Sequence, residues 1–366
     1  MADLNFLNIH IAALSCAVPS HIQKIDVNPA KSNYKYLKSF IKQIGIKQRH
    51  ISITEQTALD LGFAAAKAAL KKANWKAEDL DLIVFDTQTQ DFNPGASNSM
   101  LMQYRLGART DVMAFDVTLG CSAFPYGLSI ISSLLQQPKI NKGLLITGDS
   151  RWCNYTGPDQ IENHNNFLNG ESTTAILFEK KENNEIDIEL FTDGSGYKYL
   201  FSPSKGIRNA WRHFKKGKMP NGSIVSNNAE YMDGIEITSF ATTTVVDSIL
   251  NFLAKRGLSV NDFDGIVLHQ ANKQIITSIT KRLKVDPKKV PISLDRYGNT
   301  DGATISTTIA DAYAGLDRGP LKLLTAGFGI GLSWGVASFK IDPAVIVPII
   351  DVEDERFKEG YVEVLE

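Results

Sequence analysis

Three residues far apart in the chain have side chains suited to nucleophilic catalysis, and the first is Cys121. It follows a glycine in the stretch GCSAFPYGLSIISSLL, at the start of an expected apolar helix. The unpaired N–H groups and the positive dipole end at a helix start favour the thiolate, which is the reactive form of cysteine. The same pattern also fits a small core residue packed beside Phe124 and Leu128. A catalytic interpretation therefore needs partner side chains elsewhere.

His269 and Asn299 are the candidate partners. His269 ends the buried-strand pattern GIVLHQAN, and open α/β sheets gather functional side chains at that edge. Asn299 lies in the turn RYGNTDGAT, just before another expected helix. A structural histidine and an asparagine that caps a turn or helix are the alternatives at these positions.

A fourth candidate element is the glycine-rich segment TAGFGIGLSWG, residues 325–335, which follows a strand pattern. Glycines allow backbone N–H groups to approach a ligand closely, which suits an oxyanion hole or a phosphate cradle. A dinucleotide site is disfavoured, because the GxGxxG spacing is absent and the segment continues as a strand.

The elements that must position these side chains repeat within the chain. The stretch TALDLGFAAAKAALKKANWKAEDLDLIVFDTQT, from Thr57, is similar in pattern to FATTTVVDSILNFLAKRGLSVNDFDGIVLHQAN, from Phe240. Each predicts an amphipathic helix, an acidic turn and a buried strand. A second pair of strand–turn–helix–strand segments places Cys121 opposite Asn299. Two similar halves of alternating strands and helices indicate an α/β fold with largely parallel central strands, although any two such units share some likeness.

The composition describes a globular chain without an obvious charged partner. Of the 366 residues, 43% are hydrophobic and 22% are charged, and the formal net charge is -1. This balance favours neither a nucleic acid nor an anionic membrane as a partner. Cys16, Cys121 and Cys153 include no CxxC pair, so we expect neither a disulfide framework nor a metal site. With no leader pattern and no apolar run of about 18 residues, the sequence predicts a soluble cytoplasmic protein.

Four motifs resemble, in their order along the chain, those of the β-ketoacyl-acyl carrier protein synthase III family of the thiolase superfamily. They are GCSAFPYGL, LHQANKQI, YGNTDGATI and GFGIGLSWG. The likeness also covers GIKQRHIS, FLNGESTTAILF and MDGIEITSFA, and so extends to about Lys340. It implies a homodimer with the five-layer αβαβα thiolase fold. The pseudo-symmetric halves would be residues 1–185 and 186–342, followed by an acidic C-terminal extension at 343–366.

The resemblance also implies a role for each candidate residue. Cys121 would attack an acyl thioester and carry the acyl group. His269 and Asn299 would bind the thioester carbonyl of a malonyl-type extender and stabilise the enolate formed as carbon dioxide leaves. Backbone N–H groups would form the oxyanion hole, from Cys121, Gly329, Ile330 and Gly331. The partners would be acyl-coenzyme A or acyl-acyl carrier protein and malonyl-acyl carrier protein, with no metal or other cofactor.

Some positions depart from the family pattern where coenzyme A would be held. Ser39 or Phe40 and Gln43 stand near the places of a tryptophan and an arginine that grip this carrier. In the family an arginine faces the adenine end of coenzyme A, and this chain lacks that arginine in the corresponding stretch around Ile161. These departures weaken the expectation that coenzyme A delivers the starter.

Other positions concern docking of a carrier protein. Gln274 replaces an arginine linked to docking in the family, and Asn272 of the same motif is a further candidate contact. The segment 198–218 carries seven Lys or Arg and no acid, which suits either an acidic carrier protein, docked through Lys215 and Lys216, or a solvated loop.

Three alternatives to condensation remain open at this stage. A synthase III-like acyltransferase would pass the acyl group from Cys121 to an oxygen, nitrogen or sugar acceptor. Asp301, where the family usually has a small residue, leaves room for that function. A hydroxymethylglutaryl-coenzyme A synthase would need a carboxylate where this chain has Gln88, and a non-catalytic partner subunit would typically lack the nucleophile.

Overall fold

The computed structural model describes residues 2–25, 34–53, 55–150, 168–203, 208, 215–219, 221–226, 230–353 and 355–360. Among these residues, nine strands form one mixed sheet, whose main path runs β12-β13-β14-β7-β6-β4-β5. The two longest strands, β1 and β7, pair antiparallel along most of their length. The strands of this sheet are β1 (Ala2–Pro19), β4 (Leu82–Asp86), β5 (Met113–Val117), β6 (Lys142–Asp149), β7 (Ser172–Thr192), β12 (Gly265–Leu268), β13 (Leu321–Gly329), β14 (Ser333–Ile341) and β15 (Ile350–Val352).

The strands divide into two layers that are linked through β7. The first part of β7 pairs with β6, and its last residues pair with β14. The boundary between the expected halves, at residues 185 and 186, falls within this strand. In each half a helix and a short 3-10 turn precede a buried strand, which then pairs in parallel with a later strand: β4 with β6, and β12 with β13. The repeat predicted from the sequence is therefore present.

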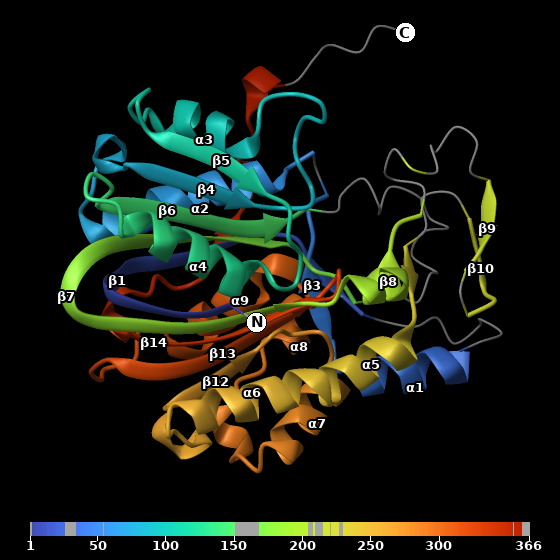
Figure 1. Ribbon diagram of the computed structural model, residues 1–366. Coiled ribbons are helices and arrows are strands. Elements are labelled where there is room, and N and C mark those ends of the chain that lie inside the picture. Colours follow the sequence, from blue (N-terminus) through green and yellow to red (C-terminus); the bar gives the residue numbers. More distant parts are fainter. Residues whose placement is uncertain are drawn as a thin grey trace, which may run out of the picture.

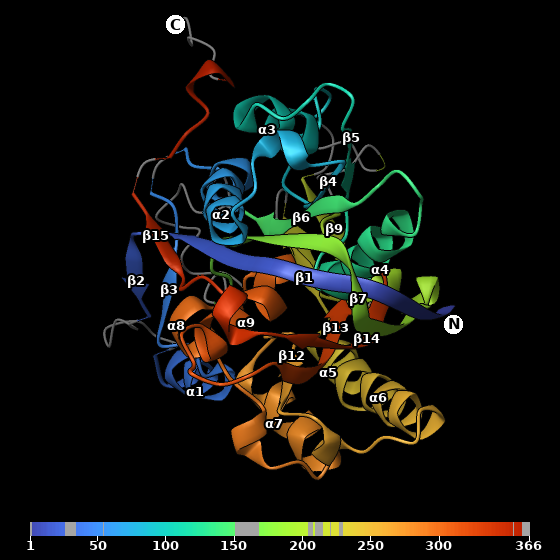
Figure 2. The same ribbon diagram turned by 90° about the vertical axis from the view of Figure 1, so that its left-hand side faces the viewer.

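Helices cover both outer faces of the sheet layers and fill the space between them (Figures 1 and 2). The central layer contains α4 and α9, α2 and α3 lie on one outer side, and α5, α6 and α7 lie on the other. This is the predicted five-layer αβαβα arrangement. The helices are α1 (Tyr34–Ile44), α2 (Ala58–Ala73), α3 (Asn98–Leu106), α4 (Ala123–Leu135), α5 (Gly234–Thr242), α6 (Thr244–Lys255), α7 (Lys273–Arg282), α8 (Leu294–Tyr297) and α9 (Thr304–Tyr313).

Three apolar clusters explain the layering. One joins α2 to β1, β4 and β6, a second encloses α4 and α9 between the sheet layers, and a third packs α6 and α7 on β12, β13 and β14. The middle cluster includes Phe124 and Leu128 of α4 and Ile305 and Ile309 of α9. Because α4 and α9 are covered on both sides, the residues at their first turns are held within the core.

Short strand pairs border this body. They are β2 (Ile22–Lys24) with β3 (Gln48–His50), β8 (Leu200–Phe201) with β11 (Tyr231–Met232), and β9 (Lys216–Lys218) with β10 (Ile224–Ser226).

The C-terminal extension is attached to the first half of the chain. Its strand β15 pairs in parallel with β1, and beyond it Glu355 accepts hydrogen bonds from Arg105 and Lys67. Arg105 also forms an ion pair with Asp60 at 2.7 Å, and both side chains are buried. The extension is therefore part of the fold as far as residue 360.

One segment of the described chain, Gly234–Lys255, has the length and hydropathy of a membrane-spanning helix. It consists of α5 and α6, and Thr243 between them has φ -113° and ψ -75°. Phe240, Val246 and Ile249 from this segment are buried against the second sheet layer. We therefore interpret it as a pair of core helices.

Candidate active site

Cys121 lies in the turn between β5 and α4, with 7% of its surface exposed. The glycine-rich strand end comes very close to it: a Cβ added to Gly329 would lie 2.6 Å from Cys121 Cβ and 2.9 Å from its Sγ. A Cβ on Gly327 would lie 3.1 Å from the Cys121 carbonyl oxygen and 2.8 Å from Cδ of Pro125. These glycines are required because β13 approaches the nucleophile from the other half of the chain.

His269 follows the last residue of β12 and continues its pairing, because its N–H donates to the Ala326 carbonyl at 2.9 Å. The side chain is 2% exposed, and its ring meets that of Phe328 edge-on at 5.3 Å. Burial lowers the pKa of His269 to about 3, so the imidazole is neutral at physiological pH. Its Nδ1 lies 2.7 Å from the Thr304 hydroxyl.

The Thr304 hydroxyl links His269 to Asp301. It donates to the Asp301 carbonyl oxygen at 3.1 Å and lies 2.7 Å from Nδ1 of His269. When this hydroxyl turns its single proton to Nδ1 instead, the imidazole proton is on Nε2. In that tautomer Nε2 is a hydrogen-bond donor.

Asn299 is held by the motif FLNGES from the other half of the chain. Its N–H donates to the Leu168 carbonyl at 2.8 Å, and its carbonyl accepts from Gly170 N–H at 2.9 Å. The intervening Asn169 carbonyl accepts from Arg49, a buried side chain of the motif GIKQRHIS, at 2.8 Å. The motifs FLNGES and GIKQRHIS, for which the sequence predicted no chemical role, thus position the backbone of Asn299.

Cys121 and Asn299 contact Asp301 directly, and His269 is linked to it through Thr304. Asn299 Oδ1 accepts the Asp301 N–H at 3.0 Å, which leaves the Asn299 amide nitrogen Nδ2 as a donor. The Cys121 thiol points at Asp301 Oδ1 with an Sγ–O distance of 4.0 Å. The Asp301 carbonyl lies beside Thr304, which contacts His269. The sequence singled out Asp301 only as a departure from the family pattern, and Thr304 and Phe328 carried no signal.

Of the expected oxyanion-hole residues, Gly329 ends β13, and Ile330 and Gly331 lie in the turn between β13 and β14. Gly331 has a φ of +133°, which favours glycine there. The Ile330 carbonyl accepts a hydrogen bond from the Ser333 hydroxyl at 2.8 Å. This arrangement fixes the turn directly beside the nucleophile.

The residues predicted to bind substrate or a carrier protein lie outside the group formed by Cys121, Asn299 and Asp301. Asn272 is the N-cap of α7, with Oδ1 accepting from Ile275 N–H at 2.8 Å, so the structure gives it a helix-capping role. Gln274, on the same helix, is exposed, as are Lys215 and Lys216 at the start of β9.

The α1 residues that replace coenzyme A-gripping side chains are also described. Ser39 and Gln43 are exposed, and Phe40 packs against the third apolar cluster. Ile161 and Cys153 lie outside the described residues.

A buried carboxyl group, that of Asp86, accepts a hydrogen bond from the turn that precedes Cys121. Asp86 Oδ1, at the end of β4, accepts the Leu119 N–H at 2.8 Å, two residues before Cys121. Burial raises the pKa of Asp86 to about 8.

Gln88 lies next to Gly120, where an added Cβ would be 2.9 Å from the Gln88 amide oxygen. Across the part of the chain that the structure describes, no group of three or more His, Cys, Asp or Glu side chains could hold a metal ion.

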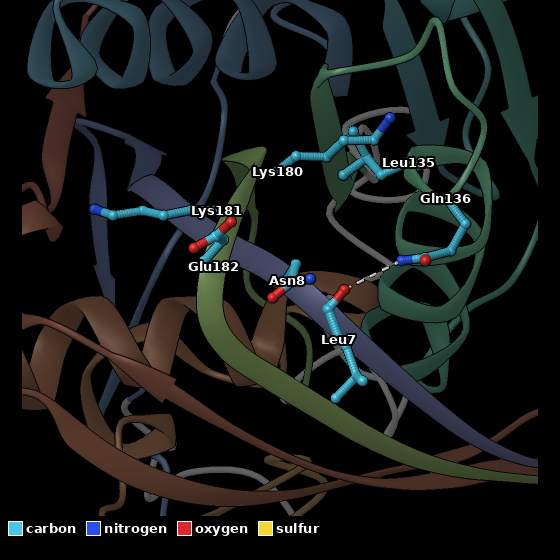
Figure 3. Close-up of a pocket in the computed structure, with 7 residues that line it drawn as sticks. All are labelled: Leu7, Asn8, Leu135, Gln136, Lys180, Lys181 and Glu182. Carbon is cyan, nitrogen blue, oxygen red and sulfur yellow. Dashed lines mark hydrogen bonds between the residues drawn. The ribbon is translucent and has the colours of Figure 1, made fainter.

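A shallow surface groove of 280 Å³ lies elsewhere on the molecule (Figure 3). It is bordered by β1 at Leu7 and Asn8, the end of α4 and the turn at Lys180–Glu182 in β7. Gln136 donates to the Leu7 carbonyl at 3.3 Å across one side. Neither Asp301 nor any of the three candidate catalytic residues lines this groove, so we assign it no catalytic role.

Comparisons with known proteins agree with this arrangement. A family model described as 3-oxoacyl-[acyl-carrier-protein (ACP)] synthase III matches residues 115–194, and one for the C-terminal part of the same family matches residues 253–341. The β-ketoacyl-[acyl-carrier-protein] synthase III of Caldanaerobacter subterraneus is 34% identical over 303 residues, covering 81% of this chain and 87% of the relative. Its counterpart in Prochlorococcus marinus is 30% identical, with coverage of 87% and 90%.

Solved structures show the same fold. A 3-oxoacyl-(acyl-carrier protein) synthase from Burkholderia xenovorans superposes with a TM-score of 0.88 at 25% identity, covering 96% of this chain and 99% of that one. The priming β-ketosynthase of the R1128 polyketide pathway superposes with a TM-score of 0.76 at 22% identity, covering 92% and 98%.

Proposed function

Because this chain belongs to the 3-oxoacyl-[acyl-carrier-protein] synthase III family, we propose that it catalyses a decarboxylative Claisen condensation on Cys121. The observation that carries this function is that Cys121 and Asn299 both contact Asp301, and that His269 is linked to the same residue through Thr304. A nucleophile and two uncharged donors suit acyl transfer followed by enolate formation. The protein is accordingly an acyltransferase of the synthase III type.

In the first half-reaction Cys121 takes an acyl group from a thioester. Its sulfur forms a bond to the acyl carbonyl carbon, and the carrier thiol leaves. The negative charge that develops on the carbonyl oxygen needs donors from the protein. The backbone N–H groups of Cys121 and of the turn at Gly329, Ile330 and Gly331 are the candidates, since β13 brings that turn against the nucleophile.

In the second half-reaction a malonyl-type thioester loses carbon dioxide. The enolate oxygen would accept hydrogen bonds from Nε2 of His269 and Nδ2 of Asn299. Both donors are uncharged in the described site, since burial lowers the pKa of His269 to about 3. The carbanion then attacks the acyl-cysteine, which releases a β-ketoacyl thioester and the free thiol. No step requires a metal or a redox cofactor.

We propose that an acyl carrier protein delivers the extender and that coenzyme A or the carrier protein delivers the starter. Support for carrier delivery comes from the exposed Lys215 and Lys216 and from the lost coenzyme A-gripping residues of α1. Reversing both lysine charges is expected to raise the KM for carrier-bound substrate. The same reversal at Lys71 and Lys72, exposed on α2, is the matched control. An unchanged KM in the first variant would contradict docking at this site.

We further propose a homodimer in the cytoplasm. Within the described residues β5 pairs only with β4, so its other edge is open for a strand from a second copy. Beside it, Met100, Tyr104 and Met113 are 53%, 65% and 45% exposed. A dimer that covers this apolar patch would remove its contact with water. Neither Cys16 nor Cys121 is part of a disulfide among the described residues, which suits a reducing compartment.

Intact-mass analysis with acyl and malonyl thioesters tests the proposed function. Acyl-coenzyme A or acyl-acyl carrier protein is expected to add one acyl group to wild type and none to Cys121→Ala. Malonyl thioester should then discharge the acyl-enzyme with release of carbon dioxide. Discharge to an alcohol, amine or sugar without carbon dioxide would instead establish the simple acyltransferase. The carboxylate of Asp301 beside Cys121 favours that second candidate, because a carboxylate can take a proton from such an acceptor.

A further inference from the structure

Asp301 is a carboxylate that contacts both Cys121 and Asn299. Its Oδ1 lies 4.0 Å from Cys121 Sγ, and its N–H donates to Asn299 Oδ1 at 3.0 Å. The side chain is 5% exposed. A carboxylate in such contact with a thiol nucleophile can take part in proton transfer, and the question is in which step.

The backbone holds Asp301 in an uncommon conformation. Its φ is +47°, a region that residues with a side chain seldom adopt, although Asp and Asn tolerate it better than most. The next residue, Gly302, fits tightly against α4, where an added Cβ would be 3.0 Å from Ala123 Cβ. Packing against α4, the helix that follows the nucleophile, thus keeps the Asp301 carboxylate facing Cys121.

His269 is poorly placed to take the thiol proton. Its Nδ1 is occupied by Thr304, and its ring is buried against Phe328. Burial also lowers the pKa of His269 to about 3, which makes the imidazole a weak base. Proton removal from Cys121 therefore needs another group, and the Sγ contact to Asp301 Oδ1 supplies one.

We propose that Asp301 is the general base that accepts the Cys121 proton during acylation. This inference rests on the proposed acylation of Cys121. The thiol proton moves to Asp301 Oδ1 as the sulfur bonds to the acyl carbon. The carbon–sulfur bond to the carrier then breaks, and the departing carrier thiolate takes the proton back from Asp301. Asp301 ends as a carboxylate, ready for the next turnover.

The same contact predicts that the resting thiol keeps its proton. A carboxylate accepts a hydrogen bond from a thiol but repels a thiolate. Among the described residues, Asp86, Asp149 and His269 are further titratable groups near this turn. Asp86 accepts the Leu119 N–H, Asp149, at the end of β6, has Oδ2 3.7 Å from a Cβ added to Gly302, and His269 is neutral. None of these three groups contributes a positive charge that would favour the thiolate.

The substitution Asp301→Asn separates base catalysis from simple repulsion. Asparagine is nearly the same size and tolerates a positive φ, but it cannot take the proton. Acylation of Cys121 by acyl-coenzyme A, followed by intact mass, is expected to slow at least tenfold, within the range typical of a lost general base. Alkylation of Cys121 by iodoacetamide, which needs only the thiolate, is expected to be as fast as in wild type or faster.

Acylation of Asp301→Asn at the wild-type rate, or acceleration of both reactions together, would overturn the proposal. Failure of wild type to become acylated would count against the proposed function instead. Asp301→Ser, which introduces a small residue like those usual in the family, is the second variant if the first does not fold. A rate of wild-type acylation that does not fall in deuterated water would also contradict proton transfer to Asp301.

Discussion

The hydroxyl oxygens of Ser122 and Ser333 lie 2.6 Å apart and join the residue after the nucleophile to the turn between β13 and β14. Ser333 also donates to the Ile330 carbonyl at 2.8 Å, so the proton between the two serines comes from Ser122. Both side chains are buried. This pair links the two expected sources of oxyanion donors, which belong to different halves of the chain.

Removing the Ser333 hydroxyl is expected to loosen that link. Ser333→Ala should slow acylation of Cys121 about tenfold, corresponding to about 1.4 kcal/mol of lost transition-state stabilisation. Ser333→Thr keeps the hydroxyl and should restore most of the rate. Rapid-quench intact mass measures this step. Ser338→Ala, on the same strand and also buried, is the control, and an equal loss there would show a general effect on β14.

A methyl group at Gly329 is expected to displace the nucleophile. An added Cβ would lie 2.6 Å from Cys121 Cβ, a distance that real Cβ atoms do not reach. Gly329→Ala should lower kcat more than a hundredfold and the free energy of unfolding by about 1–3 kcal/mol. Gly319→Ala, where an added Cβ meets nothing within 4 Å, should change neither quantity. Wild-type turnover in Gly329→Ala would refute the close approach of β13.

Iodoacetamide is expected to modify Cys121 in preference to Cys16. Cys16 is fully buried, its Sγ contacts the Thr307 hydroxyl at 3.5 Å, and burial raises its pKa to about 12. Peptide mass mapping over time should show loss of turnover together with labelling of Cys121. Cys121→Ala should leave Cys16 unlabelled in the folded protein. Equal labelling of the two cysteines in wild type would contradict this selectivity.

Loss of the Thr304 hydroxyl is expected to affect the decarboxylation step. Thr304→Val keeps the shape but removes the hydroxyl that contacts Nδ1 of His269. Decarboxylation of malonyl thioester, measured as carbon dioxide release, should fall about tenfold to a hundredfold. Thr304→Ser is the matched control and should retain the rate. A normal rate in Thr304→Val would show that the tautomer does not depend on this residue.

Asp86 is expected to make the protein less stable as the pH rises. Its pKa is about 8 in the folded state and about 3.9 in an unfolded chain. Between these values the folded state binds the extra proton, so its stability is greatest below about pH 4 and is lost as the pH approaches 8. The slope of the free energy of unfolding is at most about 1.4 kcal/mol per pH unit.

Guanidinium unfolding between pH 6.5 and 8 isolates this effect. His269, whose pKa is lowered to about 3, makes stability rise with pH only below about 6.5, so it does not contribute in that window. Asp86→Asn cannot ionise and should show a flatter profile than wild type. Parallel profiles for the two proteins would exclude Asp86 as the source.

Much of the architecture could be predicted because its signals are local. The helical spacing in α2 and α6, the buried strands β4 and β12 and the similarity between the halves are all written in short stretches. The positions of Cys121 and Asn299 before α4 and α9 followed from the same repeat. The helix-capping role of Asn272 was missed, since it depends on where α7 begins.

By itself, the sequence determined the layer pattern, the family likeness and the three residues suited to acyl transfer, because residue type, periodicity and motif order are properties of the chain. Only the tertiary structure decided that Asp301 contacts Cys121, that Thr304 contacts His269 and that Ser122 contacts Ser333. The first and third contacts join the half of the chain that contains Cys121 to the other half. The second joins the end of β12 to the start of α9. Their distances are set by how the sheet layers and α4 and α9 pack, which no local pattern specifies.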